Sequence, residues 1–367
     1  MEDNAKNRID LAGDMKIVRE LDERRWREFV EKHSQGQIFH TPEMLQVFAQ
    51  TRGHQPGVWA VIDKEDRVLA LFLPVQITLL HKWLRPLSYL TMRAVSYGSV
   101  LYEENEQGKR ALATLLKAYV KQADRGLLLT ELRNLSSTES VQGTLREHGF
   151  TYEEHLNYLI DINKPPQAIL QNIGQRTRKN IQRGLRQNLV KVVEANTLDQ
   201  VAICYELLQK TYKAANIPLA DCSLFDAAYQ VLYPKGMIRY TLAYVDQTPV
   251  ATSIDLLYKN VMYGWYGGLD RNFARYMPNE LLTWRVLEWG AEHGYSIYDF
   301  GGAGKPNEKY GVRDFKAKFN GQLVNYGRNI YAHAPLRLKL SQKFYQMARS
   351  FLFTLTSRPE SKDKALA

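Results

Sequence analysis

The sequence contains only two cysteines, Cys204 and Cys222, among its 367 residues. Two cysteines are too few for a disulfide scaffold and lack the paired spacing of a zinc site, so we expect a reducing compartment and no metal. No segment approaches the roughly 18 uninterrupted apolar residues of a membrane-spanning helix, and residues 1–21 lack the apolar core of a signal peptide. The sequence therefore predicts a cytoplasmic protein that does not span a membrane.

Several common catalytic motifs are also missing. The sequence has no Gly-x-Ser-x-Gly elbow, no His-Glu-x-x-His motif and no Walker loop. Residues 301–305 come nearest to a phosphate loop, but Pro306 follows the lysine where a helix bearing Ser or Thr should begin. The same segment lacks the third glycine and the helix of a dinucleotide-binding fingerprint. These absences exclude serine hydrolases of the elbow type, zinc proteases and P-loop enzymes.

Basic residues are in excess, with 49 Lys and Arg against 39 Asp and Glu and a net charge of +10. Six basic residues and no acidic residue lie in segment 175–191. A helix over residues 177–187 places Lys179, Arg183 and Arg186 on one side, which suits contacts to phosphates. The alternative is a solvated helix face, although such faces normally interleave both signs of charge. The charge points to nucleic acid, a nucleotide-linked substrate or an anionic membrane.

The two halves of the chain repeat one pattern of a β-hairpin followed by a helix and a strand. The expected elements of the first half are 58–62, 68–78, 107–123, 127–132 and 138–148. Those of the second half are 238–245, 250–258, 261–267, 279–293 and 296–300. The hairpin turns begin at Asp63 and Asp246, half a chain length apart. We expect an α+β (mixed α/β) fold of two tandem domains, each a mixed sheet with covering helices; two unrelated α+β domains are the alternative.

The second half also contains the candidate site. The aromatic strand 261–268 ends in glycines, and a strand that splays from its parallel neighbour there leaves amides that bind an extended acyl or peptide chain. Ligands of open α/β sheets gather at the carboxyl ends of strands, which makes Asp299 and the loop 301–311 the expected active edge. Asp299 is a candidate polar anchor, and capping of the loop amides that follow it is the alternative. Residues 310–319 alternate like a strand, with Phe315 and Phe319 on one face and Lys316 and Lys318 on the other.

Four segments together resemble the Fem-type aminoacyl transferases, which build peptidoglycan interpeptide bridges and consist of two tandem GNAT-like domains. These segments are 175–184, 278–284, 298–302 and 311–319. Weaker similarity at 39–42 and 73–75 extends the resemblance over most of the chain. We expect an N-terminal GNAT-like domain, a C-terminal GNAT-like domain and a basic amphipathic helix with a tail. Their expected ranges are 15–162, 163–333 and 334–367.

The resemblance implies a reaction in which an aminoacyl ester on tRNA is attacked by an amine of a UDP- or lipid-linked peptidoglycan precursor. No resident cofactor is implied. Lys316 matches the family lysine after phenylalanine and is assigned to stabilising the oxyanion or a phosphate, with Asp299 as the second catalytic candidate. The expected substrate-binding residues are Arg178, Lys179, Arg183, Tyr266, Gly267, Glu280, Tyr310 and Arg313.

Two rival functions are an acyl-CoA-dependent N-acyltransferase of polysaccharide or glycolipid synthesis and a non-catalytic binding module with the tandem fold. Acyl-CoA enzymes of the GNAT fold cradle pyrophosphate on a glycine-rich turn before the crossover helix. Here that turn is 271–276, which contains no glycine, and this favours the tRNA-dependent reaction.

A last amphipathic pattern lies near the C-terminus. Apolar residues recur at helical spacing among basic ones over 336–354, which predicts a peripheral contact with a membrane that carries a lipid-linked acceptor. A terminal helix docked on the core is the alternative.

Overall fold

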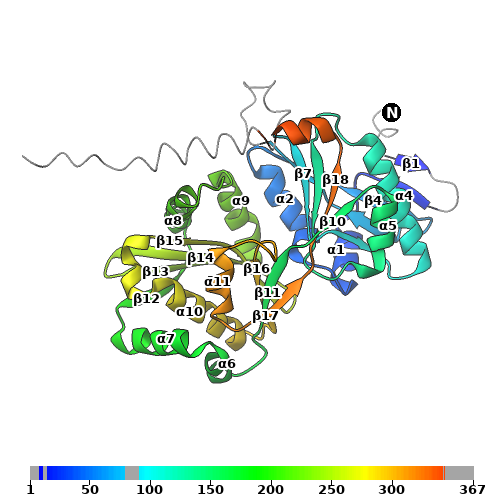
Figure 1. Ribbon diagram of the computed structural model, residues 1–367. Coiled ribbons are helices and arrows are strands. Elements are labelled where there is room, and N and C mark those ends of the chain that lie inside the picture. Colours follow the sequence, from blue (N-terminus) through cyan, green and yellow to red (C-terminus); the bar gives the residue numbers. More distant parts are fainter. Residues whose placement is uncertain (1–7, 11–14, 79–90, 342, 344–367) are drawn as a thin grey trace, which may run out of the picture.

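The computed structural model describes residues 8–10, 15–78, 91–341 and 343 (Figure 1). The first half of the chain forms strands and helices in the order strand, helix, hairpin, helix, strand. Its elements are β1 Arg8–Asp10, β2 Met15–Val18, α1 Glu23–Lys32, η1 Ile38–His40, α2 Pro42–Gln50, β3 His54–Pro56, β4 Trp59–Asp63, β5 Val68–Phe72, β6 Val75–Ile77, β7 Arg93–Tyr97, β8 Val100–Tyr102, α4 Glu106–Gln122, β9 Leu129–Arg133, η3 Glu139–Val141, α5 Gln142–Glu147 and β10 Thr151–Glu153.

The second half repeats this order, preceded by two extra helices. Strand β11 Leu156–Asp161 is the last element before the boundary expected at residues 162–163. The elements after it are α6 Pro166–Asn172, α7 Gln175–Gln187, β12 Val190–Ala195, α8 Leu198–Ala214, α9 Cys222–Leu232, η4 Tyr233–Lys235, β13 Ile238–Val245, β14 Thr248–Tyr258, β15 Val261–Leu269, η5 Arg271–Tyr276, α10 Pro278–Glu292, β16 Ile297–Gly302, α11 Gly311–Ala317, β17 Gln322–Asn325 and β18 Arg328–Ala332. Both predicted hairpins, the basic helix and the crossover helix of each half are confirmed.

Three sheets carry the fold. The first half contributes a five-stranded sheet, β1-β2-β4-β5-β8, and most of a six-stranded sheet, β10-β18-β9-β7-β6-β3. The second half contributes most of a seven-stranded sheet, β12-β13-β14-β15-β16-β11-β17. One parallel pair occurs in each half, β7 with β9 and β15 with β16. This shared arrangement is the structural form of the repeat seen in the sequence.

The two halves exchange one strand each. β11 follows the first half in sequence but lies between β16 and β17, and β18 follows the second half but lies between β9 and β10. The expected boundary at residues 162–163 therefore does not separate the sheets. The crossing segments touch, because the amide of Gly327 donates to the carbonyl of His155 at 3.2 Å. Strand pairing thus joins both halves beside the site described below.

A single hydrophobic core also runs across the junction. Phe39, Phe48 and Val95 of the first half share one buried cluster with Leu208 and Phe225 of the second. Helix α2 packs on α9 at this junction, where Figure 1 draws them side by side. The relative position of the two halves is therefore set by buried apolar side chains as well as by the exchanged strands.

Helices cover both faces of the seven-stranded sheet. In β14, Ile254 and Leu256 pack in the cluster of α8 and α9, whereas Leu257 packs in the cluster of α10. Because successive strand residues point to opposite faces, α10 lies on the face opposite α8 and α9. Helix α7 packs on α10 through its buried residues Ile181 and Gly184.

The expected strand over residues 310–319 is wrong, since this segment contains helix α11. Phe315 and Phe319 are four residues apart, a spacing that places them on one side of a helix as well as on one face of a strand. Both rings pack against Phe300. Lys316 turns inward and is 8% exposed, whereas the side chain of Lys318 is 44% exposed, so the two lysines do not share a face.

The C-terminal amphipathic segment is helical over the described residues 335–341, and the rest of the expected range up to 354 lies outside the described residues apart from residue 343. Leu336 and Leu340 are largely exposed, and Arg337 donates to the carbonyl of Arg125 at 2.7 Å. In the described part of the chain, no helix is long and apolar enough to cross a membrane.

Candidate active site

The two parallel strands of the second half separate at a defined point. β15 and β16 pair from Val261 opposite Ile297 to Tyr263 opposite Asp299, and their pairing ends there. β15 continues to Leu269 while paired with β14. Beyond Tyr263, β15 therefore has no pairing with β16 on this side. The predicted splay is present, and Asp299 lies at its apex.

Lys316 reaches this apex from α11. Its ammonium donates to the carbonyls of Phe300 and of Gly302, the latter at 2.9 Å. Burial lowers the pKa of Lys316 to about 8, while the charge of Asp299 opposes this shift. Two of the three N–H donors are used by the protein, which leaves one for a substrate oxygen.

Asp299 is nearly fully buried beside Lys316. Its Oδ1 accepts hydrogen bonds from the amide of Gly301 at 2.8 Å and from the Asn157 side chain at 3.4 Å. Burial raises the pKa of Asp299 to about 6, although the Gly301 amide and the Lys316 charge act in the opposite direction. The Asp299 carboxylate thus caps the loop through the Gly301 amide. Its pKa of about 6 also allows it to exchange a proton near neutral pH.

Gly301 holds the two strands at their closest separation. Its φ is +73°, and a Cβ built there lies 3.1 Å from the Gly264 carbonyl oxygen and 3.7 Å from Lys316 Nζ. Only glycine combines this left-handed conformation with so close an approach. The Gly-Gly segment is therefore a packing feature of the apex, not a phosphate loop.

Tyr266 and Gly267 lie on the open part of β15. The Tyr266 ring packs on Phe225 at 4.9 Å between centroids, while Gly267 is exposed. Gly268 allows helix α8 to approach, because a Cβ there would lie 2.8 Å from the backbone of Leu207. Tyr266 is thus held against α9, whereas Gly267 exposes its backbone.

Tyr310 and Arg313 organise the loop beyond β16. Arg313 donates to the carbonyls of Pro306 and Lys305 at 2.9 Å each. The Tyr310 ring packs against Gly304, where a Cβ would lie 3.0 Å from it. Both side chains hold the loop in the structure, and their contact with substrate stays a prediction.

The basic residues of α7 lie at another part of the surface, beside the start of α10. Lys179 and Arg183 are exposed, and Arg183 donates to the Met277 sulfur at 3.6 Å, at the N-cap of α10. Glu280, in the first turn of α10, pairs with Lys318 at 3.3 Å. Arg178 instead donates to the carbonyl of Gln171. The structure thus brings Arg183 and Glu280 to the same helix end, and Lys318 links this end to α11.

Sequence reasoning missed the first-half contribution to this region. Glu131 and Arg133 of β9 and Arg328 of β18 form ion pairs, and the electrostatic influence of Arg133 and Arg328 extends to Tyr263 in the splay. Burial raises the pKa of Glu131, but the charges of Arg133 and Arg328 outweigh it and hold that pKa at about 2. These residues are far apart in sequence, and the strand exchange brings them together.

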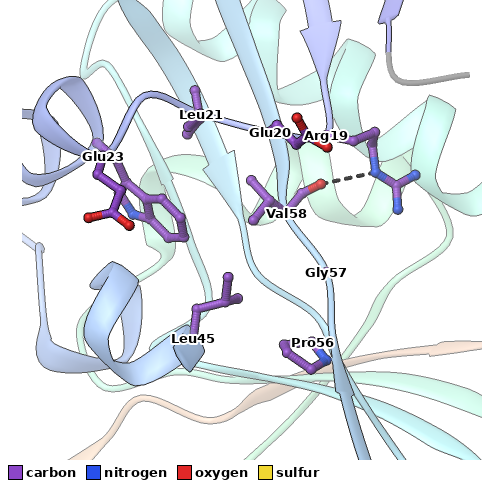
Figure 2. A pocket seen from close by; sticks show the side chains of 9 residues that line it. Arg19, Glu20, Leu21, Glu23, Leu45, Pro56, Gly57 and Val58 are labelled. Atoms are coloured by element: carbon purple, nitrogen blue, oxygen red, sulfur yellow. Dashed lines mark hydrogen bonds between the residues drawn. The ribbon is translucent and has the colours of Figure 1, made fainter. Parts of the chain in front are cut away.

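A hollow lies elsewhere, in the first half of the chain. Figure 2 shows its lining, and its volume is about 580 Å³. Arg19 stacks on Trp59 at 3.6 Å and donates to the carbonyl of Val58 at 3.0 Å at its edge. It includes none of the predicted site residues. Within the described ranges, no group of three His, Cys, Asp or Glu side chains is placed to hold a metal ion.

Comparison with known proteins identifies the class of fold. Residues 174–316 match the family described as an acetyltransferase (GNAT) domain. The tandem GNAT protein from the clavulanic acid biosynthesis pathway superposes with a TM-score of 0.56 at 11% identity, covering 88% of this chain and 99% of that one. The chain thus has the tandem GNAT-like fold, and its residues 174–316 match an acetyltransferase domain family.

More particular likenesses lie within that class. The crystal structure of FemX superposes with a TM-score of 0.67 at 15% identity, covering 89% of this chain and 98% of that one. The lipid II:glycine glycyltransferase of Staphylococcus saprophyticus is 20% identical over 78% of this chain and 86% of its own length. The resemblance to Fem-type aminoacyl transferases predicted from the sequence is confirmed.

Proposed function

We propose that the protein transfers an amino acid from aminoacyl-tRNA to an amine of a peptidoglycan precursor, forming a peptide bond of the cell-wall bridge. The observation that carries this proposal is the buried Lys316–Asp299 pair at the apex of the β15–β16 splay. The likeness to a lipid II:glycine glycyltransferase supports the acceptor class.

The splay provides the parts that aminoacyl transfer needs. The aminoacyl group lies along the open edge of β15, where exposed backbone at Gly267 can pair with it. The acceptor amine attacks the ester carbonyl carbon, and the free N–H of Lys316 stabilises the oxyanion that forms. Asp299, ionised at neutral pH, takes the proton that the amine loses. The ester C–O bond then breaks, and the tRNA hydroxyl leaves with that proton.

The surface around the start of α10 favours tRNA over acyl-CoA as donor. The amides of the preceding η5 segment are used internally, because Phe273 N donates to the Asp270 carbonyl and Met277 N to the Ala274 carbonyl. Pro278 lacks an amide hydrogen, and Glu280 adds negative charge to the first turn. This helix end is thus poorly suited to a pyrophosphate. The adjoining basic face of α7 instead offers separated cations, which suit successive phosphates of an RNA backbone.

Over its described residues, the first half of the chain is also poorly suited to a pyrophosphate at the matching helix end. Its corresponding helix α4 is capped by the side chain of Asn105, which accepts from the amide of Gly108 at 2.8 Å. Glu103, Glu104 and Glu106 surround this end with negative charge. We infer that the first half contributes to acceptor binding.

A lipid-linked acceptor would bring the protein to the inner face of the plasma membrane. The exposed Leu336 and Leu340, with Arg337 and Lys339 beside them, are the residues proposed for that peripheral contact. Sedimentation with anionic vesicles tests it, and equal sedimentation of wild type and Leu336→Ser/Leu340→Ser would contradict it.

The donor and acceptor are tested together by incubating the protein with charged tRNA and either UDP-linked or lipid-linked precursor. We expect an extended precursor peptide by mass spectrometry, lost in Lys316→Ala and retained in the surface control Lys117→Ala, an exposed lysine on α4. Transfer from acetyl-CoA but from no charged tRNA would replace the proposal by an acyl-CoA N-acyltransferase. Transfer from neither donor, with a phenotype that depends on Arg178 and Arg183 but not Lys316, would indicate a binding module.

A further inference from the structure

The junction between the halves contains a cluster of charged side chains that the proposed transfer step does not use. Glu131 accepts hydrogen bonds through both carboxylate oxygens, from Arg133 at 3.2 Å and from Arg328. Arg328 also donates to His155 Nε2 at 2.9 Å. In the pairing of β9 with β18, Arg133 lies directly opposite Arg328.

Positive charge exceeds negative charge in this cluster. Arg93 adds a third guanidinium, and its charge also acts on Glu131. Among the described residues, Glu131 is the one carboxylate that forms ion pairs with Arg133 and Arg328. The nearby Lys305 is neutralised by Glu153, and Lys316 faces Asp299. Burial lowers the pKa of His155 to about 4, and the charge of Arg328 adds to this shift. The imidazole therefore adds no charge at neutral pH.

The arginines also retain unused donors. The Nε atoms of Arg93, Arg133 and Arg328 are buried and have no hydrogen-bond partner in the described part of the chain. The side chains of Arg133 and Arg328 are still 28% exposed, whereas that of Glu131 is 7% exposed. Buried guanidinium groups normally find partners, and the partly exposed side chains of Arg133 and Arg328 can be reached by an anion from solvent.

The cluster adjoins the apex of the splay. Arg133 pairs with Tyr97 at the end of the parallel β7–β9 ladder, just as Asp299 pairs with Tyr263 at the end of the β15–β16 ladder. Phe39 packs between the two tyrosines, with ring centroids 5.2 Å from Tyr97 and 5.3 Å from Tyr263. The two halves thus place the end of the β7–β9 ladder, which carries Arg133, beside the end of the β15–β16 ladder, which carries Asp299.

We propose that Arg133 and Arg328 bind a carboxylate of the acceptor peptide that lies a few bonds from the reacting amine. This rests on the proposed function. The planar guanidinium groups of two arginines can form paired hydrogen bonds with a carboxylate. Their position beside Tyr263 is close to the apex at which the amine reacts, so the carboxylate would lie close to that amine. A diphosphate of the precursor is separated from that amine by a sugar and peptide bonds, so it would lie farther from the apex.

The test compares acceptor peptides that carry this carboxylate free or amidated, all without a diphosphate. In binding titrations, we expect wild type to bind the free carboxylate about 10- to 100-fold more tightly than the amide, because charge-assisted bonds are lost in the amide. Arg328→Lys should abolish that preference while its transfer kcat stays within about threefold and its KM rises. Arg285→Lys, an exposed arginine on α10, is the matched control.

The binding arm separates failure of this inference from failure of the proposed function. A carboxylate preference that depends on Arg328 supports the inference even if charged tRNA donates nothing. Equal binding of free and amidated peptides, or no binding of either, overturns it. So does a preference that Arg328→Lys leaves intact. Equal thermal melting of Arg328→Lys and Arg285→Lys verifies that both variants fold.

Discussion

Replacing Lys316 by methionine removes the proposed oxyanion donor while keeping a side chain of similar length. Loss of one oxyanion donor typically costs about 10²- to 10³-fold in kcat. Lys316 is buried and bonded to two backbone carbonyls of β16, so no nearby solvent replaces the missing donor readily. The transfer rate under single-turnover conditions should therefore fall by that factor. A variant that keeps more than about a tenth of the wild-type rate would refute the assigned role.

The same substitution changes how stability depends on pH. Burial lowers the pKa of Lys316 from 10.5 to about 8 in the folded protein. Between these values the unfolded chain holds a proton that the folded chain has released, so the free energy of unfolding rises with pH. The full gain is about 3 kcal/mol, because one pKa unit corresponds to about 1.4 kcal/mol.

Urea titrations of both proteins measure this difference directly. From about pH 7.5 to about pH 10, the free energy of unfolding of wild type should rise by about 2 kcal/mol relative to Lys316→Met. Groups that do not interact with Lys316 contribute equally in the two proteins, so the difference reports Lys316 together with Asp299, whose pKa its charge lowers. Parallel pH dependences would show that the lysine is not held in a desolvated site.

Three further predictions concern neighbouring parts of the site. The pH profile of kcat should be bell-shaped, rising as Asp299 ionises near pH 6 and falling as Lys316 deprotonates near pH 8; a flat profile across this range would contradict the pair. Gly301→Ala should lower stability by about 1–2 kcal/mol and slow transfer, since its φ is +73° and the new Cβ meets the Gly264 carbonyl; unchanged melting and kinetics would count against the tight apex. Lys179→Glu with Arg183→Glu should raise KM for charged tRNA at least tenfold, and weaken its salt dependence, without changing KM for a short aminoacyl-nucleotide donor; equal effects on both donors would rule out an RNA contact.

Local sequence patterns were sufficient to predict the elements around the apex. The hairpins, the β15 glycines and the Tyr-Asp-Phe-Gly-Gly strand end follow from short periodic runs and turn residues. The helix at α11 was predicted as a strand because residues at i and i+4 share a face in both structures. Packing on Phe300 decides between them, and packing partners are not visible in a local window.

The strand exchange was beyond local sequence reasoning. β11 and β18 are short β-rich segments that each follow one half, and their sequences do not show which sheet accepts them. Arg133 and Arg328 are placed opposite each other only through that exchange. The charged junction was therefore missed, whereas Asp299 became a candidate from its place at the end of a strand and Lys316 from the family resemblance.

A structure of the protein with a stable amide analogue of the aminoacylated tRNA 3′ end tests the central claim most directly. We predict that the aminoacyl carbonyl oxygen lies about 3 Å from Lys316 Nζ, with the aminoacyl group along β15 between Tyr266 and the Gly301 apex. An analogue bound in the first-half hollow beside Arg19, or one that leaves the splay empty, would contradict the account.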